Sequence, residues 1–211
     1  IRTEATGSGA VYFVKEMLTH KGKDIKGMRV VVSGSGNVAT HVAEKLIHEG
    51  ALPLTLSDRG GYIYSEKGLT QETVEAVKTL KEKRNGVLKD LVLEAGTIYL
   101  EGAPWQKVKA DIYIPSATQN EIVKEDAEAI VNQGALLVAE ASNMPSTLDA
   151  VAVFQNAGLL FGPAKAVNAG GVAVSGLEMS QNAMHLQWTS EEVDEKLRTI
   201  MKHIHGTCVR Y

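Results

Sequence analysis

Residues 28–39 read MRVVVSGSGNVA. This stretch predicts a buried strand over about 28–33, a glycine turn and the start of a helix, which together place a pyrophosphate on the backbone N–H groups of a helix N-terminus. Gly34 can make the tight turn, Gly36 lets the backbone approach the phosphates, and Ala39 lets the helix pack close to the strand. We therefore expect a dinucleotide-binding turn. The alternatives are a purely structural α/β turn and another nucleotide-like ligand such as S-adenosylmethionine.

An acidic residue follows the second expected strand, residues 52–57. Asp58 stands about 20 residues after Gly36, where dinucleotide sites carry the acid that binds the ribose hydroxyls. A strand-end Asx turn is the alternative interpretation of Asp58. The next residue, Arg59, can pair with the 2′-phosphate of NADP, and an exposed surface arginine is its alternative.

The composition is that of an ordinary globular chain. Its 211 residues are 44% hydrophobic and 22% charged, with a formal net charge of −3 and no basic stripe, which argues against a nucleic-acid partner. Cys208 is the only cysteine, so the chain fits a reducing, cytoplasmic location. No apolar run reaches the roughly 18 residues that span a membrane. The missing initiator Met predicts that residues 1–211 are a single domain excised from a longer protein.

Strands and helices alternate along the chain. We expect strands over 28–33, 52–57, 97–100, 111–114, 135–139 and 158–161, with a small hairpin near 62–64. Helices are expected over 8–21, 38–47, 70–83, 87–95, 120–132, 147–156 and 165–187, and a last one after Ser190. This alternation predicts an α/β fold with a doubly wound, mostly parallel, Rossmann-like sheet.

Polar or glycine-bearing clusters follow five of these strands. In a parallel sheet, ligands bind outside the carboxyl ends of the strands, so we expect the clusters to converge on one rim and to form a single crevice. The clusters are residues 33–37, 57–61, 115–120, 140–145, and 162–165 continuing to 168–171.

Some positions in these clusters and beyond have two interpretations. Asn120 and Asn143 can hydrogen-bond the nicotinamide ribose or amide, and Asn120 can also cap the helix over 120–132. Gly170 and Gly171, inside a helical pattern, indicate a break, a close approach or a hinge, or else a loop before the helix. Ser175 can face a substrate or bond back to its own helix.

These residues contain no evident set of catalytic groups. The sequence has no acid–base pair suited to hydride transfer, no G-x-S-x-G elbow and no metal-ligand set. His41 and His48 are expected to be exposed helix residues, and Trp105 and Trp188 to be packing residues.

Several motifs, in the same order and over nearly the whole chain, resemble the cofactor domain of hexameric glutamate dehydrogenases. They are RTEATG at 2–7, GSGNVA at 34–39, ATQN at 117–120, NMP at 143–145, KAVNAGGV at 165–172 and SGLEMSQN at 175–182. Leucine and phenylalanine dehydrogenases share the fold and the hydride chemistry but diverge in the later motifs. A cofactor domain of that type, and a non-catalytic dinucleotide-binding regulatory module, are the alternatives.

The resemblance implies reversible oxidative deamination of L-glutamate to 2-oxoglutarate and ammonia. It also implies that the catalytic lysine and aspartate belong to an N-terminal substrate domain that this chain lacks, so we name no catalytic residue here and expect the chain alone to be inactive. By the same resemblance, the whole enzyme is a homohexamer.

Individual roles are carried over by motif. The expected cofactor-binding residues are Thr6, Gly34, Ser35, Gly36, Asn37, Val38, Ser57, Asp58, Arg59, Lys81, Arg84, Ala117, Thr118, Asn120 and Asn143. The resemblance places Ser175 on the glutamate side-chain carboxylate and Val172 in the wall of that pocket.

The chain departs from the family pattern at three places. Ser8 stands where Tyr is usual, Ser116 where Cys is usual, and residues 141–142 read Ala-Ser where Gly-Ala is usual. The pair Ser57-Asp58 resembles the NADP-preferring members, although an acid at a strand end should repel a phosphate. We therefore expect NADP as the cofactor, with NAD possible.

Overall fold

The run Arg29–Val32 forms strand β1 of a parallel sheet in the computed structural model, which describes residues 2–82 and 86–210. Within these residues the sheet has five strands in the order β2-β1-β6-β7-β8. The other four are β2 (Leu52–Pro53), β6 (Ile112–Ile114), β7 (Leu137–Ala139) and β8 (Leu160–Gly162). All pairings are parallel, for example Val31 with Tyr113, so the predicted doubly wound parallel sheet is confirmed.

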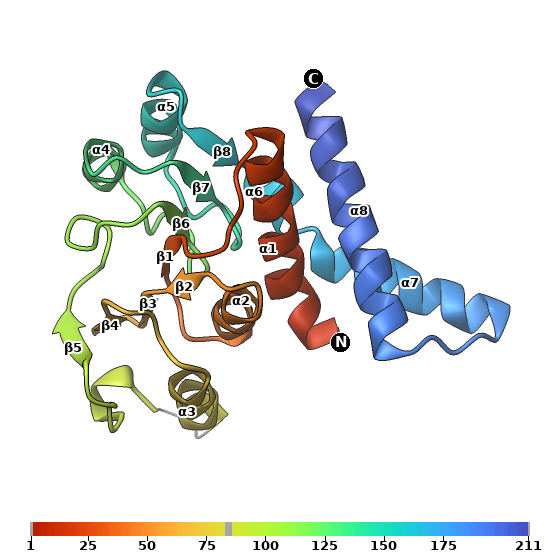
Figure 1. The fold of residues 1–211 in the computed structure, drawn as a ribbon, viewed down its shortest axis with the longest axis horizontal. Helices are drawn as coiled ribbons and strands as arrows, with labels where there is room; N and C mark the ends of the chain where they lie inside the picture. Colours follow the sequence, from red (N-terminus) through yellow and green to blue (C-terminus); the bar gives the residue numbers. More distant parts are fainter. Residues whose placement is uncertain (1, 83–85, 211) are drawn as a thin grey trace.

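Helices cover both faces of this sheet, because alternate residues of its strands point to opposite sides. Val30 and Val32 are buried with Phe13, whereas Val31 is buried with Phe154. The first face carries α1 (Arg2–His20), α2 (Asn37–His48) and the short α6 (Ala164–Val167), and the second carries α4 (Lys124–Asn132) and α5 (Leu148–Asn156) (Figure 1).

A second, antiparallel sheet corrects the expected strand over 52–57. That segment divides into β2 and β3 (Thr55–Ser57), and β3 pairs with β4 (Gly61–Ser65) and β4 with β5 (Thr97–Glu101). The Thr55 hydroxyl accepts a hydrogen bond from Val32 N at 3.1 Å and donates one to Val32 O at 2.8 Å. These side-chain hydrogen bonds take the place of backbone pairing with β1 at the point where the chain passes from β2 into β3. The expected hairpin near 62–64 is present, with these residues in its second strand: β3 and β4 pair antiparallel on either side of residues 58–60, and β4 is also the middle strand of this sheet.

Other helix boundaries also differ from the expectation. The predicted helix over 87–95 is a single 3-10 turn, Leu88–Asp90, between α3 (Gln71–Glu82) and β5. The helix expected from 120 begins at Lys124, after Asn120 adopts a left-handed backbone with φ of 54°, so Asn120 does not cap it. The first helix begins at Arg2 rather than near residue 8.

The long helix expected over 165–187 is broken at Asn168 and Ala169 into α6 and α7 (Gly170–Met184), and α8 (Ser190–Arg210) follows. A Cβ on Gly170 would lie 2.2 Å from Ala5 O, so α7 and α1 touch through their backbones. The close approach predicted for the Gly170–Gly171 pair is therefore confirmed, and the loop alternative is wrong because Gly170 starts the helix.

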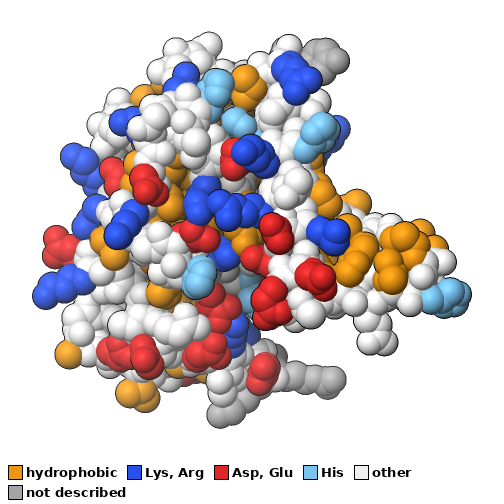
Figure 2. Space-filling view, turned by 45° about the vertical axis from the view of Figure 1, so that its right-hand side comes forward, with side chains coloured by type: hydrophobic (Ala, Val, Ile, Leu, Met, Phe, Trp, Pro, Cys, Tyr) orange, Lys and Arg blue, Asp and Glu red, His pale blue; other side chains and the backbone are white. Residues whose placement is uncertain are grey.

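Helix α7 extends away from the sheet as an arm beside α8 (Figure 1). Its outer surface is apolar, and Figure 2 shows hydrophobic side chains gathered over it. Val172 is 78% exposed and Met179 72% exposed on this helix. Among the described residues no helix, α7 included, combines the length and apolar character needed to cross a membrane.

Candidate dinucleotide site

The glycine turn joins β1 to α2 at the carboxyl edge of the parallel sheet. Gly34 has a φ of +89°, and a Cβ there would lie 2.9 Å from Ser116 O and 3.2 Å from Ala39 Cβ. A Cβ on Gly36 would meet no described atom within 4 Å, so the space over this residue is open. Gly36 is the N-cap of α2, and no described side chain caps it. The N-terminal N–H groups of α2 thus meet the requirement for an anion site.

Two cavities flank this turn. The first has a volume of about 460 Å³ and the second about 750 Å³, which suits small-molecule sites of roughly 300–1,000 Å³. The first is lined by Ser33, Gly34, Ser35, Gly36, Ser57, Asp58, Arg59, Gly102, Ala103, Pro104, Trp105, Ser116, Ala117, Thr118 and Glu121. The second is lined by Thr6, Val38, Ser116, Ala117, Thr118, Gln119, Ala141, Ser142, Asn143, Asn168 and Val172.

The cavities share the loop that follows β6. Ser116, Ala117 and Thr118 line both, so this loop divides them. A ligand with two large ends and a narrow, anionic middle fits such a pair, with the middle over the glycine turn. The strand-end clusters converge on one rim as expected, but they line two cavities rather than the single crevice that the sequence predicted.

The carboxylate of Asp58 is engaged by its own surroundings. Oδ1 accepts hydrogen bonds from Gly60 N at 3.0 Å and Gly61 N at 3.3 Å, and Oδ2 accepts one from Leu88 N at 2.8 Å. Lys81 Nζ lies 3.5 Å from Oδ2. Burial alone would raise the pKa of Asp58, but these hydrogen bonds and the lysine hold it below its usual value. Asp58 thus makes the Asx-type turn that the sequence offered as the alternative.

The neighbours of Asp58 differ in how they meet the first cavity. Ser57 is buried, and its Oγ accepts a hydrogen bond from Gly34 N at 2.8 Å, so it supports the glycine turn. Arg59 is exposed at the cavity wall. Lys81 Nζ donates to Gly86 O at 2.8 Å, so it is bound to the loop rather than directed at the cavity. Arg84 lies outside the described residues.

Asparagines join the loops around the second cavity. Asn168 Nδ2 donates to Asn143 Oδ1 at 3.1 Å, and Thr6 lines the same space. Asn120 is not among the lining residues of either cavity, and its backbone N–H donates to Met144 O at 2.9 Å. The Ser175 hydroxyl bonds back to Gly171 O at 3.1 Å, the alternative foreseen for it.

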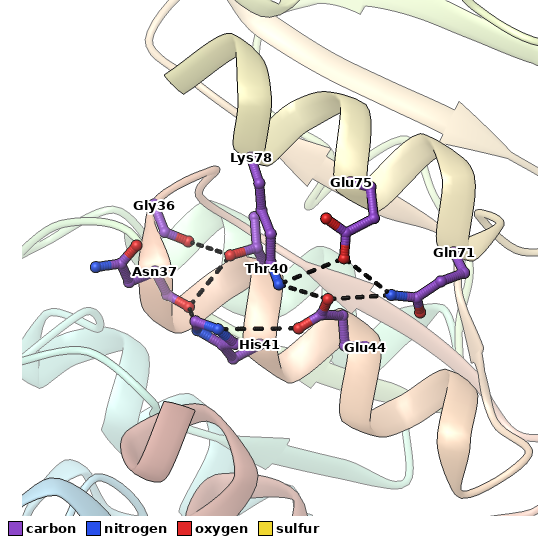
Figure 3. Close-up of polar contacts among 8 residues, drawn as sticks. All are labelled: Gly36, Asn37, Thr40, His41, Glu44, Gln71, Glu75 and Lys78. Carbon is purple, nitrogen blue, oxygen red and sulfur yellow. Dashed lines mark hydrogen bonds and ion pairs between the residues drawn. The ribbon is translucent and has the colours of Figure 1, made fainter. Parts of the chain in front are cut away.

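A polar network fixes the first turn of α2 against α3 (Figure 3). His41 Nδ1 donates to Asn37 O at 2.7 Å, and its side chain is only 12% exposed, so the expectation of an exposed His41 was wrong. Glu44 binds Lys78 of α3. Burial would raise the pKa of Glu44, but its hydrogen bonds, that of Lys78 foremost, lower it.

Glu121 is a site residue that the sequence interpretation missed. It lines the first cavity and accepts a hydrogen bond from Ala117 N at 3.1 Å. Burial raises its pKa, although hydrogen bonds with Ser33, Ala117 and Thr118 oppose the shift. Its position directly after the 117–120 cluster was the available signal. Asn168 and residues 102–104 also line the cavities without having been assigned a role.

The expected packing roles of the two tryptophans agree with the structure. Trp105 is buried, 1% exposed, in the core beside the first cavity. Trp188 is partly buried against the core, and Lys196 Nζ lies 4.5 Å from its ring centroid. Among the residues described, no group of three or more His, Cys, Asp or Glu side chains is placed to hold a metal ion.

Comparison with known proteins identifies similar sequences and structures over the whole chain. A glutamate dehydrogenase of Bacteroides thetaiotaomicron is 51% identical over all of this chain and 48% of its own length, and the NADP-specific glutamate dehydrogenase of Escherichia coli is 48% identical over all of this chain and 47% of its own. The structure of Plasmodium falciparum glutamate dehydrogenase 2 superposes with a TM-score of 0.95 at 43% identity, covering 99% of this chain and 46% of that one.

The chain therefore spans about half the length of the curated relatives it matches. The family description Glutamate/Leucine/Phenylalanine/Valine dehydrogenase matches residues 1–211. On this evidence the chain belongs to the Glutamate/Leucine/Phenylalanine/Valine dehydrogenase family.

Proposed function

We propose that this chain is the cofactor-binding domain of a glutamate dehydrogenase, which interconverts L-glutamate with 2-oxoglutarate and ammonia using NADP(H). The observation that carries the proposal is the pair of cavities on either side of the uncapped N-terminus of α2. The names of the three relatives described above, each a glutamate dehydrogenase, support the substrate assignment.

The residues present fit a dinucleotide. Its diphosphate would lie over the open face of Gly36, its adenosine in the first cavity and its nicotinamide in the second. Bound there, the nicotinamide supplies the hydride acceptor and donor. The proposed cofactor-binding residues are those named from the sequence, of which Thr6, Gly34, Ser35, Gly36, Val38, Ser57, Asp58, Arg59, Ala117, Thr118 and Asn143 line the cavities.

The side chains of this chain bind and orient rather than transfer protons. Val172 lines the second cavity, and the Ser175 hydroxyl, one turn further along α7, can leave its bond to Gly171 O for a substrate carboxylate. We propose that the proton-transfer groups belong to a separate substrate domain. The exposed apolar face of α7 supports this, because exposed apolar patches of this kind mark interaction surfaces. A cytoplasmic homohexamer is part of the same proposal.

The proposed preference for NADP rests on the charge balance around Arg59. The Asp58 carboxylate is paired with Lys81 and hydrogen-bonded to three backbone N–H groups, so its repulsion of a 2′-phosphate is reduced. Arg59 is exposed at the same cavity and carries the donors that match a phosphate.

Calorimetric titration of the protein with NADP⁺ and NAD⁺ tests this preference. We expect tighter binding of NADP⁺ and expect Arg59→Ala to weaken it roughly tenfold, since one lost charge-assisted hydrogen bond is worth about 1.5–3 kcal/mol before solvent screening. NAD⁺ affinity should stay unchanged. Arg198→Ala, an exposed arginine on α8, is the control. Equal wild-type affinities for the two cofactors would contradict the proposed preference.

An activity measurement on the full-length protein separates the substrate alternatives. We expect glutamate to drive NADP⁺ reduction far faster than leucine or phenylalanine. Faster turnover of an apolar amino acid would reassign the substrate, and tight cofactor binding without turnover of any of the three would favour the regulatory module.

A further inference from the structure

The carboxyl group of Glu121 lies in the first cavity together with the glycine turn. Its oxygen Oε1 accepts a hydrogen bond from Ala117 N at 3.1 Å, and Ser33 and Thr118 also hydrogen-bond to it. Ser33 Oγ in turn accepts a hydrogen bond from Ser116 N at 2.9 Å. The carboxyl group therefore holds the loop that divides the two cavities.

These partners of Glu121 are all neutral. The charged groups that share its cavity are Asp58, which is paired with Lys81, and Arg59, which is exposed at the wall. The charged or titratable groups on neighbouring elements have partners other than Glu121. On α4, Lys124 pairs with Glu128, and Asp126 accepts hydrogen bonds from Val123 N and Gln106. Glu140 accepts hydrogen bonds from Ser146 N and Ala164 N, and His41 donates to Asn37 O. Within the described residues none of these groups forms an ion pair with Glu121, and burial raises the pKa of its carboxyl group above the usual value.

A diphosphate over Gly36 would bring negative charge into this same cavity. A like charge close to a partly buried carboxylate favours the protonated form, and the protonated group can both accept from Ala117 N and donate a hydrogen bond. We propose that Glu121 is a positioning residue that takes up a proton when the diphosphate of the dinucleotide binds, so that the dividing loop keeps its anchor without charge repulsion. This inference rests on the proposed function.

Thermodynamic linkage between proton binding and diphosphate binding fixes the direction in which the affinity changes with pH. Because the bound state holds the proton more tightly than the free state, affinity for the diphosphate falls as pH rises between the two pKa values of Glu121. Below both values the group is protonated in either state, and above both it is ionised in either state. A separation of about one unit between the two values would change the affinity about tenfold.

Calorimetric titration with ADP-ribose tests the proposal. This probe carries the diphosphate but has no 2′-phosphate to titrate. Runs in buffers of different ionisation enthalpy between about pH 5 and 8 give the number of protons taken up on binding. We expect a measurable uptake by the wild-type protein, none by Glu121→Gln, and wild-type uptake by Glu125→Gln, which removes a nearby exposed carboxylate on α4.

The outcomes separate this inference from the proposed function. Two results would contradict the role of Glu121 without contradicting the dinucleotide site. One is binding of ADP-ribose without proton uptake, and the other is equal proton uptake by Glu121→Gln and the wild-type protein. Failure to bind both ADP-ribose and NADP⁺ would overturn the site itself. If Glu121→Gln does not fold, the pH dependence of ADP-ribose affinity in the wild-type protein is the test. An affinity that falls with rising pH supports the proposal, and an affinity that does not change with pH refutes it.

Discussion

Gly34 has a backbone that only glycine adopts easily, with a φ of +89°, and a Cβ there would press on Ser116 O at 2.9 Å. We expect Gly34→Ala to lower the free energy of unfolding by about 2–4 kcal/mol, from left-handed strain and from overpacking. It should also abolish detectable NADP⁺ binding, because the turn and the dividing loop would move apart. Denaturant unfolding and calorimetry measure the two effects.

The matched control is Gly22→Ala. Gly22 also has a positive φ, +68°, but a Cβ there would meet no described atom within 4 Å. Backbone strain should therefore lower the free energy of unfolding of Gly22→Ala by only roughly 1 kcal/mol, and the variant should keep its cofactor affinity. Equal losses of unfolding free energy in Gly34→Ala and Gly22→Ala would show that the close approach of Gly34 to Ser116 O does not matter for stability.

Asp58 should make a pH-dependent contribution to stability. Its pKa in the folded protein lies below the unfolded value of 3.8, so its stabilisation is present above that value and is lost as pH falls toward the folded pKa. We expect Asp58→Ala to cost about 1–3 kcal/mol near neutral pH and less in acid, because backbone N–H groups such as Leu88 N lose their acceptor.

Denaturant midpoints measured from neutral pH down to about pH 3 test this dependence. Asp90→Ala, an exposed acid two residues from Leu88, should cost little at any pH. A cost for Asp58→Ala that stays constant with pH would mean that the carboxylate charge does not stabilise the loop.

The sequence could predict residues whose role depends on local conformation. Gly34 and Gly36 follow from the strand-turn-helix pattern, and the Asx turn of Asp58 is a local interaction as well. For Glu121 the sequence offered only its position after the 117–120 motif, because its hydrogen bond with Ser33 joins residues that are far apart in sequence and adjacent in space.

At the scale of elements, the contact between α1 and α7 depends on glycine. A Cβ on Gly170 would lie 2.2 Å from Ala5 O, whereas one on Gly176, further along the same helix, would meet no atom of the described structure within 4 Å. We expect Gly170→Ala to destabilise the protein by about 1–3 kcal/mol through forced separation of the helices. Gly176→Ala should stabilise it by about 0.5–1 kcal/mol through helix propensity.

Thermal or denaturant unfolding of this pair distinguishes packing from propensity. Opposite signs are the expected result, because both substitutions make the same chemical change in the same helix. Stabilisation by both would mean that the two helices separate at no cost and that the close approach is not needed.

Elements with strong periodicity were predictable, and those defined by distant pairing were not. Helix α2 buries Ala39, Val42, Ala43 and Leu46 as its spacing indicates. The division of residues 52–57 depends instead on the Thr55 hydroxyl meeting Val32, and the second sheet depends on β5 pairing with β4. A single sequence carries no local signal for such contacts.

At the scale of the whole molecule, the parallel sheet brings loops that are far apart in sequence to one edge. The first turn of α2, the loop after β6 and the loop after β7 together line the second cavity through Val38, Thr118 and Asn143. The topology rule for parallel sheets predicted this convergence from the polar clusters that follow the expected strands. It could not predict that the loop after β6 would divide the site into two cavities.

The structure of the protein in complex with NADP⁺ tests the central claim most directly. We expect the diphosphate over Gly36 at the N-terminus of α2, the adenosine in the cavity lined by Arg59 and Trp105, and the nicotinamide in the cavity lined by Thr6 and Asn143. A dinucleotide bound with its ends exchanged between the cavities, or bound away from the glycine turn, would contradict this assignment.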